Sequence, residues 1–419
     1  MDRFRVVGPN RLEGRIRAAG AKNAALPSLA ATLLTDAPVL LRGIPGVADI
    51  RTMRRLLAHD GVASAEEDGA LRLVPEAGAA ADEAPYELVK TMRASVLVLG
   101  PLLARRGRAR VSLPGGCAIG VRPIDQHLAG LEALGAKVEL DRGYVEARAG
   151  RLTAARFRFA LPTVTGTENV MMAATLARGT TVLENCAREP EIEDLGRLLN
   201  AMGAVIEGAG AERITITGVD RLGGADHAIL PDRIEGGTYL IAAALTGGDV
   251  TVDNLVAADL APLLERLAET GAEVDSGPGW IRVRRDGELL PRDVVTAPHP
   301  GFPTDLQAQY MALMTQARGH AAICETVFEN RFQHVPELAR MGAAIGVEGN
   351  LARVSGPTPL SGAKVMATDL RASACLVLAG LAARGETWID RIYHLDRGYE
   401  AMERKLQSLG ARVERISGS

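Results

Sequence analysis

Cys117 lies in a segment whose composition would expose a thiol. The segment reads Pro114-Gly-Gly-Cys-Ala-Ile-Gly-Val-Arg122, and a Pro with three Gly in seven positions is typical of a mobile, exposed loop. The positive charge of Arg122, five residues further on, would lower the pKa of a nearby thiol and make it reactive. Most isolated cysteines are instead buried small apolar residues, a description that fits Cys186, Cys324 and Cys375. For Cys117 the sequence leaves both interpretations open.

Asp305 is a second candidate for chemistry. It ends the segment His299-Pro-Gly-Phe-Pro-Thr-Asp305 and precedes an apolar stretch that we expect to be helical. An Asp at a helix start usually caps the helix. Thr304 could take that role and leave the carboxylate free to act as a base. From the residues alone, the cap is the favoured interpretation.

Cationic residues recur at the expected helix starts and at the loops that follow strands. Cationic side chains beside the free N–H groups of a helix start form a natural anion cradle, so we expect a substrate with phosphate and carboxylate groups. The simpler alternative is that these residues pair with acids on the surface. The helix starts are expected at Lys22-Asn23, Lys90 with Arg93, Thr167-Glu168-Asn169, Asp232-Arg233, Asp305, and Asp369 with Arg371; the loops hold Arg122 with Asp125, Arg188 with Glu189, Arg331, and Arg391 with Arg397.

The chain consists of six repeats. A Leu-rich helical stretch that ends in Gly-Ala and a β-branched residue recurs, and the first copy is degenerate. The glycines are 74, 68, 68, 71 and 68 residues apart. Each glycine is expected just after a helix, where a left-handed backbone is needed, and a strand should follow it. The six glycines are Gly61, Gly135, Gly203, Gly271, Gly342 and Gly410.

Each repeat also contains an earlier helix that runs into a further strand. Strands joined through helices pair in parallel, which predicts an α/β fold. Six units are too many for one core, so we expect two domains of three units, residues 21–229 and residues 1–20 with 230–419, joined by a double hinge near 20 and 229. The N-terminal strand should pair with the second domain, because the last unit lacks its own closing strand. A ligand cleft between the domains would follow.

The composition excludes several classes of protein. The chain has 419 residues, 48 Lys plus Arg against 51 Asp plus Glu, and 3% aromatic residues, which argues against a nucleic-acid binder. Its four cysteines lack metal-ligand spacing and fit a reducing compartment. The N-terminus has no signal-peptide pattern, and the longest apolar runs, near Ser95–Ala104 and Ala374–Ala383, are too short to cross a membrane. No Walker A or G-x-G-x-x-G pattern supports a phosphate-binding loop. We therefore expect a cytoplasmic protein without a membrane partner.

Long motifs along the whole chain resemble the UDP-N-acetylglucosamine 1-carboxyvinyltransferases, the enolpyruvyl transferases of peptidoglycan synthesis. The resemblance implies two inside-out α/β barrel domains, each of three pseudosymmetric βαβαββ-type units. The motifs are Ala19-Gly-Ala-Lys22-Asn23, Lys90-Thr-Met-Arg93-Ala-Ser, Leu113-Pro-Gly-Gly-Cys117, Phe302-Pro-Thr-Asp305, Glu325-Thr-Val-Phe-Glu-Asn-Arg331-Phe, Ala367-Thr-Asp369-Leu-Arg371 and Arg391-Ile-Tyr-His-Leu-Asp-Arg397-Gly-Tyr.

The resemblance implies a reaction. The enolpyruvyl group of phosphoenolpyruvate would move to the 3′-hydroxyl of UDP-N-acetylglucosamine through a tetrahedral intermediate, with release of phosphate. This is the first committed step of cell-wall synthesis, on which cell shape and division depend. Cys117 would protonate C3, carry a pyruvate-derived adduct and react with the antibiotic fosfomycin. Asp305 would take the hydroxyl proton, which reverses the preference for a cap.

By the same resemblance, Lys22, Arg122 and Arg397 would clamp phosphoenolpyruvate beside Asn23, and Arg331, Asp369 and Arg371 would order the surrounding groups. No metal, organic cofactor or obligatory protein partner is implied. One departure concerns the uridine-binding turn, where the family often has Lys-Val-Ser-Val-Gly and this chain has Pro162-Thr-Val-Thr-Gly166. The implied contacts to the nucleotide sugar are Arg93, Arg122, Pro123, Ile124, Asp125, Gln126, Thr163, Val164, Thr165, Gly166, Asp305 and Val327.

Two other readings compete. A 5-enolpyruvylshikimate-3-phosphate synthase shares the fold and the chemistry but lacks the Pro-Gly-Gly-Cys segment, so Leu113–Arg122 argues against it. A non-catalytic homologue that binds the nucleotide sugar and regulates would be expected to lose Cys117, Lys22, Asp305 or Arg397, and all four are present.

Overall fold

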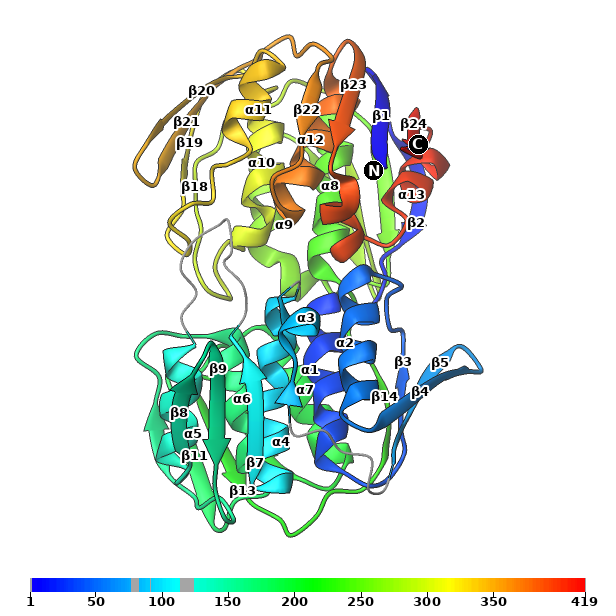
Figure 1. The fold of residues 1–419 in the computed structure, drawn as a ribbon. Helices are drawn as coiled ribbons and strands as arrows, with labels where there is room; N and C mark the ends of the chain where they lie inside the picture. The colour runs from blue at the N-terminus through cyan, green and yellow to red at the C-terminus, as the bar shows by residue number, and fades with distance from the viewer. Residues whose placement is uncertain (1, 77–82, 91, 114–123, 419) are drawn as a thin grey trace. The chain divides into compact units, whose positions relative to one another are not determined.

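The structure is a computed structural model that describes residues 2–76, 83–90, 92–113 and 124–418. These residues divide into two compact units (Figure 1). The first unit comprises the described residues from Gly20 to Leu230, and the second comprises the chain up to Ala19 and from Pro231 onward.

Each unit contains three four-stranded sheets with one topology. Numbered by their order within a repeat, the first strand is parallel to the second, and the second and third strands both pair antiparallel with the fourth, which lies between them. In the first unit the sheets run, in spatial order, β14 (Ala225–Ala228), β3 (Val39–Arg42), β5 (Ala70–Pro75), β4 (Val62–Glu67); β6 (Glu83–Ala84), β7 (Arg108–Ser112), β9 (Tyr144–Arg148), β8 (Lys137–Asp141); and β10 (Arg156–Arg158), β11 (Thr180–Glu184), β13 (Arg213–Thr217), β12 (Val205–Glu207).

The second unit repeats this order with one substitution. Its last repeat lacks a fourth strand, and β1 takes that place between β23 and β24, as the sequence predicts (Figure 1). The sheets are β2 (Glu13–Arg17), β15 (Asp249–Asp253), β17 (Trp280–Arg284), β16 (Glu273–Gly277); β18 (Val294–Val295), β19 (Gly319–Cys324), β21 (Leu351–Gly356), β20 (Ala344–Glu348); and β22 (Lys364–Met366), β23 (Gly385–Asp390), β1 (Arg3–Gly8), β24 (Val413–Ile416).

The two strands nearest the unit boundary are exchanged. β2 leads along the chain into the first helix of the first unit but pairs with β15 of the second unit. β14 leads into the first helix of the second unit but pairs with β3 of the first. In each unit, one sheet is therefore completed by a strand that directly precedes, along the chain, the first helix of the other unit.

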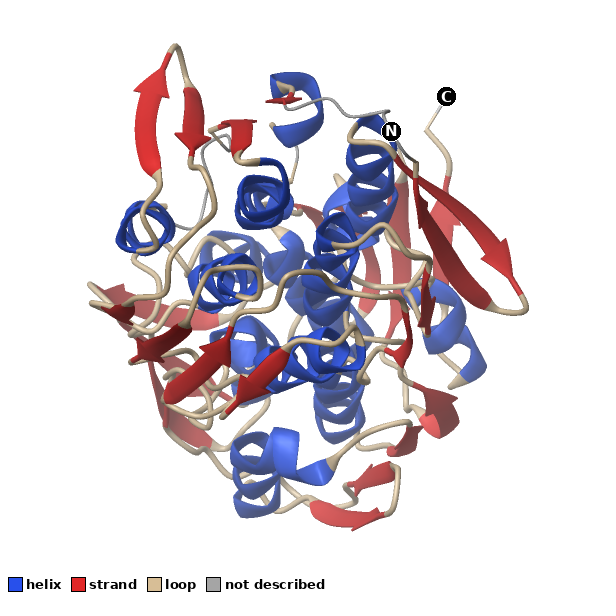
Figure 2. Cartoon of the chain, turned by 90° about the horizontal axis from the view of Figure 1, so that it is seen from below, coloured by secondary structure: helices blue, strands red, loops and turns tan. Residues whose placement is uncertain are grey.

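The helices lie inside each unit and the sheets face outward (Figure 2). In five of the six repeats the helix after the first strand is buried nearly all round; in α8, for example, every residue from Arg233 to Leu245 is buried. Such helices belong in a core. The helices after the first strands are α1 (Lys22–Ala31), α3 (Tyr86–Val89) with α4 (Leu99–Arg106), α6 (Val164–Ala174), α8 (Arg233–Thr246), α10 (Gln307–Met314) and α12 (Leu370–Ala382).

The second helix of each repeat is amphipathic and ends as the sequence predicts. Three to five positions after the last residue of each helix the chain enters a strand. The glycine between them has a left-handed backbone in all six repeats, with φ from 83° to 102°. The predicted α/β class with three repeats per unit is thus confirmed, with the sheets remaining separate from one another. These helices are α2 (Ala48–His59), α5 (Asp125–Ala133), α7 (Pro190–Ala201), α9 (Ala261–Glu269), α11 (Val335–Arg340) and α13 (Met402–Ser408).

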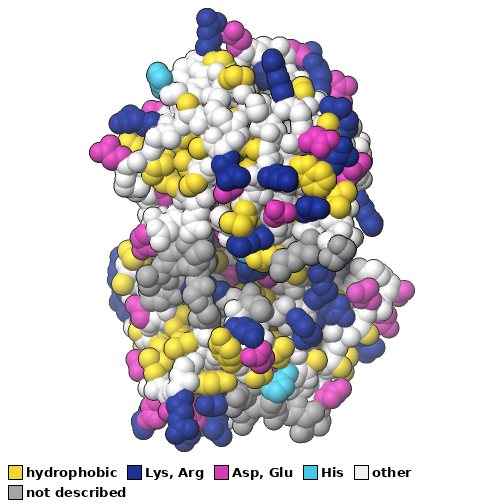
Figure 3. Space-filling view, turned by 45° about the horizontal axis from the view of Figure 1, so that its top comes forward, with side chains coloured by type: hydrophobic (Ala, Val, Ile, Leu, Met, Phe, Trp, Pro, Cys, Tyr) yellow, Lys and Arg dark blue, Asp and Glu magenta, His cyan; other side chains and the backbone are white. Residues whose placement is uncertain are grey.

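Acidic and basic side chains are interspersed on the face drawn in Figure 3. On the sheets they pair between the first and second strands, as in Arg15–Asp253, Arg42–Asp226 and Arg156–Glu184, at 2.6 to 2.8 Å. Within the described part of the chain, every helix is too short or too polar to cross a membrane.

The contribution of β1 can be tested at Phe4, which is fully buried in the core of the second unit. We expect Phe4→Ala to lower the free energy of unfolding by about 3–5 kcal/mol, because it removes apolar contacts and leaves a cavity. Urea denaturation would measure the change. Arg3→Ala on the neighbouring, exposed position of β1 is the control, and a similar loss in both variants would contradict a core role for this strand.

Candidate active site

Cys117, Arg122 and Pro123 lie outside the described residues, so the remaining candidates define the site. They fall into one group in each unit.

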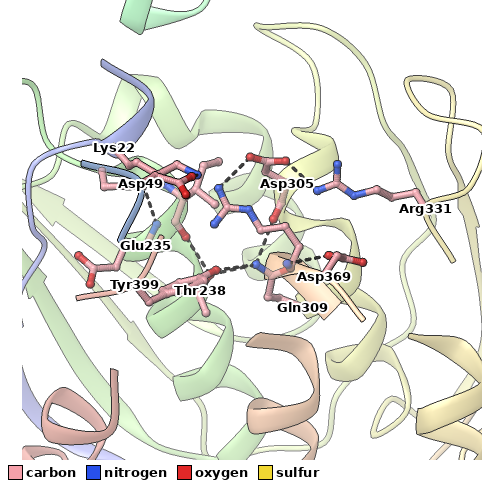
Figure 4. A network of polar contacts seen from close by, with 12 residues as sticks. Lys22, Asp49, Glu235, Thr238, Asp305, Gln309, Arg331, Asp369 and Tyr399 are labelled. Carbon is pink, nitrogen blue, oxygen red and sulfur yellow. Dashed lines mark hydrogen bonds and ion pairs between the residues drawn. The ribbon is translucent and has the colours of Figure 1, made fainter. Parts of the chain in front are cut away.

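In the second unit, the carboxylate of Asp305 lies between two guanidinium groups (Figure 4). One oxygen accepts a hydrogen bond from Arg331 and the other from Arg371, each at 2.8 Å. Both arginine side chains are almost completely buried. Burial alone would raise the pKa of Asp305, but the charges of Arg371 and Arg331 outweigh it and hold the pKa well below its ordinary value. The same pairing raises the pKa of Arg371 against the effect of its burial.

The interpretation of Asp305 as a helix cap is wrong. Its short helix, Thr304–Leu306, follows Pro303, and no side chain caps it. Thr304 does not cap it either, since its hydroxyl donates to Glu325 at 2.8 Å. The two arginines hold the carboxylate more strongly than a cap could, because both of its oxygens make charge-assisted bonds.

Asp369 has a local structural role. Its carboxylate accepts hydrogen bonds from the backbone N–H groups of Arg371 and Ala372, at 2.8 and 3.0 Å, and so caps α12. This cap fixes the first turn of α12, from which Arg371 reaches Asp305. The influence of Asp369 on the site therefore passes through the position of Arg371.

A buried polar network lies behind Asp305 (Figure 4). The amide of Gln309 donates to the backbone carbonyl of Asp305 at 3.0 Å and lies 3.1 Å from the hydroxyl oxygens of Thr238 and Tyr399. The guanidinium of Arg371 lies 5.5 Å from the centre of the Tyr399 ring. Residues of α8, α10 and α12, which are equivalent helices of the three repeats, thus hold one carboxylate and its partner.

The other two candidates of this unit lie on segments that follow strands. Val327 donates its backbone N–H to Glu325 at 2.8 Å. Arg397 is the last residue of the short helix Ile392–Arg397 and is half-buried, two positions before Tyr399.

In the first unit, Lys22 begins α1 and its ammonium lies 3.2 Å from the carboxylate of Asp49, on α2. The Asp49 side chain is 7% exposed and that of Lys22 12%, so this ion pair is largely removed from water. Asn23, the next residue, is exposed. A cation held at a helix start beside free N–H groups suits an anionic ligand.

Three further segments with candidate residues are joined by two buried side chains. His127, on α5, lies 3.2 Å from the hydroxyl of Thr165 and 3.0 Å from the amide nitrogen of Asn169, both on α6. Asn169 also donates to the carbonyl of Val96 and accepts from the N–H of Gly100. The three segments are the helix start at Arg93, the segment Ile124–Gln126, whose Gln126 accepts from the N–H of Leu161, and the turn Thr163–Gly166.

The protonation of His127 follows from this network. Asn169 is oriented by Val96 and Gly100, so its amide nitrogen donates to Nδ1 of His127, and Nε2 carries the proton that is donated to Thr165. Burial, together with the positive charge of Arg93, lowers the pKa of His127 to about 4. The ring is therefore neutral near pH 7.

The start of α6 is three residues earlier than predicted. Thr163 is its N-cap and accepts from the N–H of Gly166, so Thr167–Asn169 lie within the helix. The polar side chains of Thr167, Glu168 and Asn169 suggested a helix start, but all three are buried inside the unit and lie within the helix.

Sequence reasoning missed Asp49, His127 and Glu325. A charged or imidazole side chain inside an otherwise apolar pattern was the available signal at Asp49 and His127. Glu325 belongs to a motif that was noticed for Arg331 and Val327. What each of them contacts depends on segments far apart in the chain, and spacing does not reveal that.

Each unit offers charged groups suited to chemistry on an anionic substrate. In the first unit Lys22 is a cation at a helix start. In the second unit Arg397 is a cation at a helix end, and Asp305 is an ionised acceptor with fixed orientation. Such preorganised charges stabilise charge that develops during a reaction.

Comparisons with known proteins agree along the whole length of the chain. The family model of EPSP synthase (3-phosphoshikimate 1-carboxyvinyltransferase) matches residues 6–406. A UDP-N-acetylglucosamine 1-carboxyvinyltransferase from Sorangium cellulosum is 60% identical, over 100% of this chain and 99% of its own length. One from Anaeromyxobacter sp. (strain K) is 59% identical over 100% of both chains.

Solved structures have the same fold. The enolpyruvyl transferase NikO from Streptomyces tendae matches with a TM-score of 0.88 at 27% identity, over 100% of this chain and 99% of that one. EPSP synthase from Acinetobacter baumannii matches with a TM-score of 0.76 at 18% identity over both full chains, which supports the fold alone.

The buried state of His127 predicts how stability depends on pH. Because the pKa falls from 6.5 in a free side chain to about 4 in the fold, the unfolded chain binds more protons between these values. The contribution of the neutral His127 to the free energy of unfolding is therefore fully present above pH 6.5 and is lost as the pH falls towards 4. In His127→Gln we expect this slope to be smaller by up to about 1.4 kcal/mol per pH unit.

Urea denaturation of wild type and variant at several pH values from 4.5 to 7.5 would measure the slopes. His59→Gln, on the exposed end of α2, is the control for the loss of an imidazole. A slope that is the same in wild type and His127→Gln would show that His127 does not titrate in this way.

Proposed function

The chain belongs to the EPSP synthase family of 1-carboxyvinyltransferases, and we propose that it transfers the enolpyruvyl group of phosphoenolpyruvate to the 3′-hydroxyl of UDP-N-acetylglucosamine, releasing phosphate. The observation that carries this proposal is the 60% identity, over essentially the full length of both chains, to a relative with that name. The reaction is a step of peptidoglycan synthesis, and both substrates are small molecules.

Phosphoenolpyruvate would bind to Lys22, Asn23, Arg122 and Arg397. Its phosphate and carboxylate together need several fixed cations, and the position of Lys22 at the start of α1 supports this role. The Lys22–Asp49 pair orients the ammonium before the substrate arrives, so less entropy is lost on binding.

The nucleotide sugar would bind to the segments that contain Arg93, Ile124–Gln126 and Thr163–Gly166, with Asp305 and Val327 on the sugar side. The network of His127 and Asn169 supports this assignment, because it fixes all three segments of the first unit relative to one another. The family's lysine at the uridine-binding turn is absent here, and the N–H groups of Val164 and Thr165 in the first turn of α6 would take over part of its interaction with the diphosphate.

Asp305 would accept the proton of the attacking hydroxyl, although its low pKa makes it a weak base. Protonation of C3 leaves a cationic centre at C2. When the hydroxyl oxygen bonds to C2, that oxygen becomes positively charged and its proton becomes strongly acidic. A weak base then suffices, provided that it is ionised and correctly oriented. Arg331 and Arg371 supply both conditions, because they keep Asp305 ionised and hold its two oxygens in place.

Cys117 would be the acid that protonates C3, with the resemblance of its segment to the family as support. After the tetrahedral intermediate forms, loss of a proton from C3 and cleavage of the C2–O bond to phosphate would complete the transfer. We also propose that the two units are the two domains of the enzyme, with residues near 20 and 229 as the hinge. A reducing, cytoplasmic location fits Cys186, Cys324 and Cys375, which are free thiols.

The proposal is tested by phosphate release. We expect the purified protein to release phosphate from phosphoenolpyruvate when UDP-N-acetylglucosamine is present, and not with shikimate 3-phosphate, the acceptor suggested by the family model's name. A malachite-green assay with each acceptor in turn would measure it. Release with shikimate 3-phosphate alone would overturn the choice of acceptor, and no release with either would favour a regulatory protein.

The role of Cys117 is tested by substitution. Cys117→Ser should lower turnover at least about a hundredfold, since general acid catalysis typically contributes 10²–10⁴-fold, and it should abolish labelling by fosfomycin. Cys324→Ser, which removes another free thiol, should keep both turnover and labelling. Intact-mass spectrometry would report the adduct, and undiminished labelling of Cys117→Ser would assign the reactive thiol elsewhere.

A further inference from the structure

The residue that follows the second strand of a repeat has a similar role in several repeats. At Gly43, Asn185, Asn254 and Arg391 the backbone is left-handed, with φ from 56° to 73°. The two asparagine amides bind back to the residue that follows the first strand: Asn185 donates to the carbonyl of Phe159 and Asn254 to that of Ala18, both at 2.9 Å. In these two repeats the asparagine side chain thus links the end of the second strand to the end of the first.

Glu325 occupies this position in the fifth repeat and differs in kind. It is a carboxylate rather than a donor, it is 2% exposed, and its backbone is not among those in the left-handed region. One oxygen accepts from the hydroxyl of Thr296 at 2.9 Å and from the N–H groups of Val327 and Phe328 at 2.8 and 3.2 Å. The other oxygen accepts from the hydroxyl of Thr304 at 2.8 Å.

These contacts join two segments that meet at the candidate site. Thr304 precedes Asp305, and the segment that begins with Val327 leads to Arg331, whose guanidinium binds Asp305 at 2.8 Å. Glu325 therefore holds both segments that the Asp305–Arg331 pair connects. A carboxylate suits this position because all four groups around it donate in this arrangement, and a carboxylate accepts on both of its terminal atoms.

We propose that Glu325 is the positioning residue of the nucleotide-sugar side of the site, fixing the Val327 backbone and the Asp305 carboxylate in the arrangement that receives the sugar. The inference rests on the proposed function, which it deepens by adding a residue that acts through Val327 and Asp305 without touching substrate. Loss of Glu325 weakens the binding and use of the sugar acceptor but not of phosphoenolpyruvate, because the proposed contacts to phosphoenolpyruvate lie on other segments.

The test compares Glu325→Ala with Glu325→Gln. We expect Glu325→Ala to lower kcat/KM for UDP-N-acetylglucosamine by about tenfold or more, because it leaves buried donors unpaired, while the KM for phosphoenolpyruvate changes by less than about twofold. Glu325→Gln should stay within about threefold of wild type, since its oxygen still accepts from Thr296, Val327 and Phe328 and its amide can donate to the rotated hydroxyl of Thr304.

Two threonine variants provide a matched pair on neighbouring elements. Thr304→Val removes a donor to Glu325 and should raise the KM for the nucleotide sugar. Thr315→Val, just after the C-terminal end of α10, removes a buried hydroxyl whose hydrogen bonds, among the described residues, go to Ala312 and Gln316, and it should leave that KM unchanged. Equal effects of the two threonine variants would overturn the inference, as would a Glu325→Gln variant as impaired as Glu325→Ala.

Hydrogen exchange separates this inference from the proposed function. We expect the amides of Val327 and Phe328 to exchange faster in Glu325→Ala than in wild type or Thr315→Val, with no substrate present. Absence of phosphate release by the wild-type protein would count against the proposed function alone, whereas unchanged exchange at these amides would overturn the role of Glu325.

Discussion

One backbone hydrogen bond recurs in five of the six repeats as described and positions the segments on which the candidate site is built. The residue after the first strand donates its N–H to the last residue of the second strand, at 2.9 to 3.1 Å. The bond extends the parallel pairing by one step and delivers the chain to the helix start at a fixed point. The pairs are Ala18–Asp253, Phe159–Glu184, Ile229–Arg42, Thr296–Cys324 and Ala367–Asp390. In two repeats the first strand is β2 or β14, so the bonds Ala18–Asp253 and Ile229–Arg42 also anchor the chain where it passes from one unit to the other.

The second repeat cannot form this bond, because Pro85 follows β6 and has no N–H. The helix after it is also interrupted: a short helix, Tyr86–Val89, is followed by a 3₁₀ segment, Arg93–Val98, and only then by α4. Arg93 owes its position to this interruption, since it begins the second segment rather than lying inside a continuous helix. The repeat that departs from the common pattern is also the one whose sequence contains Cys117. One copy of a repeated fold can be irregular when the other copies keep their regular elements and all three share one hydrophobic core, as in this unit.

Much of this fold could be predicted from the sequence, because it depends on local rules. The six glycines mark helix ends through their left-handed backbone, and the missing strand of the last repeat indicated where β1 pairs. The predicted bounds, residues 1–20 with 230–419 and residues 21–229, already imply that β2 pairs in the second unit and β14 in the first, and the strand pairings agree. At the site the limits were different. Asp305, Arg331 and Arg371 were all identified, but spacing assigned Asp305 to a cap because it does not reveal that two guanidinium groups from other segments converge on it. Asp369, in contrast, is the cap of α12.

Asp305 illustrates why the supporting residues matter more than the basicity of the carboxylate. Two buried arginines next to an acid cost desolvation free energy, which is offset only when the geometry is good and the hydrogen bonds are complete. Gln309 and Glu325 supply that geometry from behind, one through the Asp305 carbonyl and the other through Thr304. If the carboxylate acted as a strong base, its arginine partners would oppose the reaction by lowering its pKa. Since the proton it receives comes from an oxygen bonding to a cationic carbon, orientation and permanent ionisation are the properties that count. The same residues that weaken Asp305 as a base therefore make it effective in the step proposed for it.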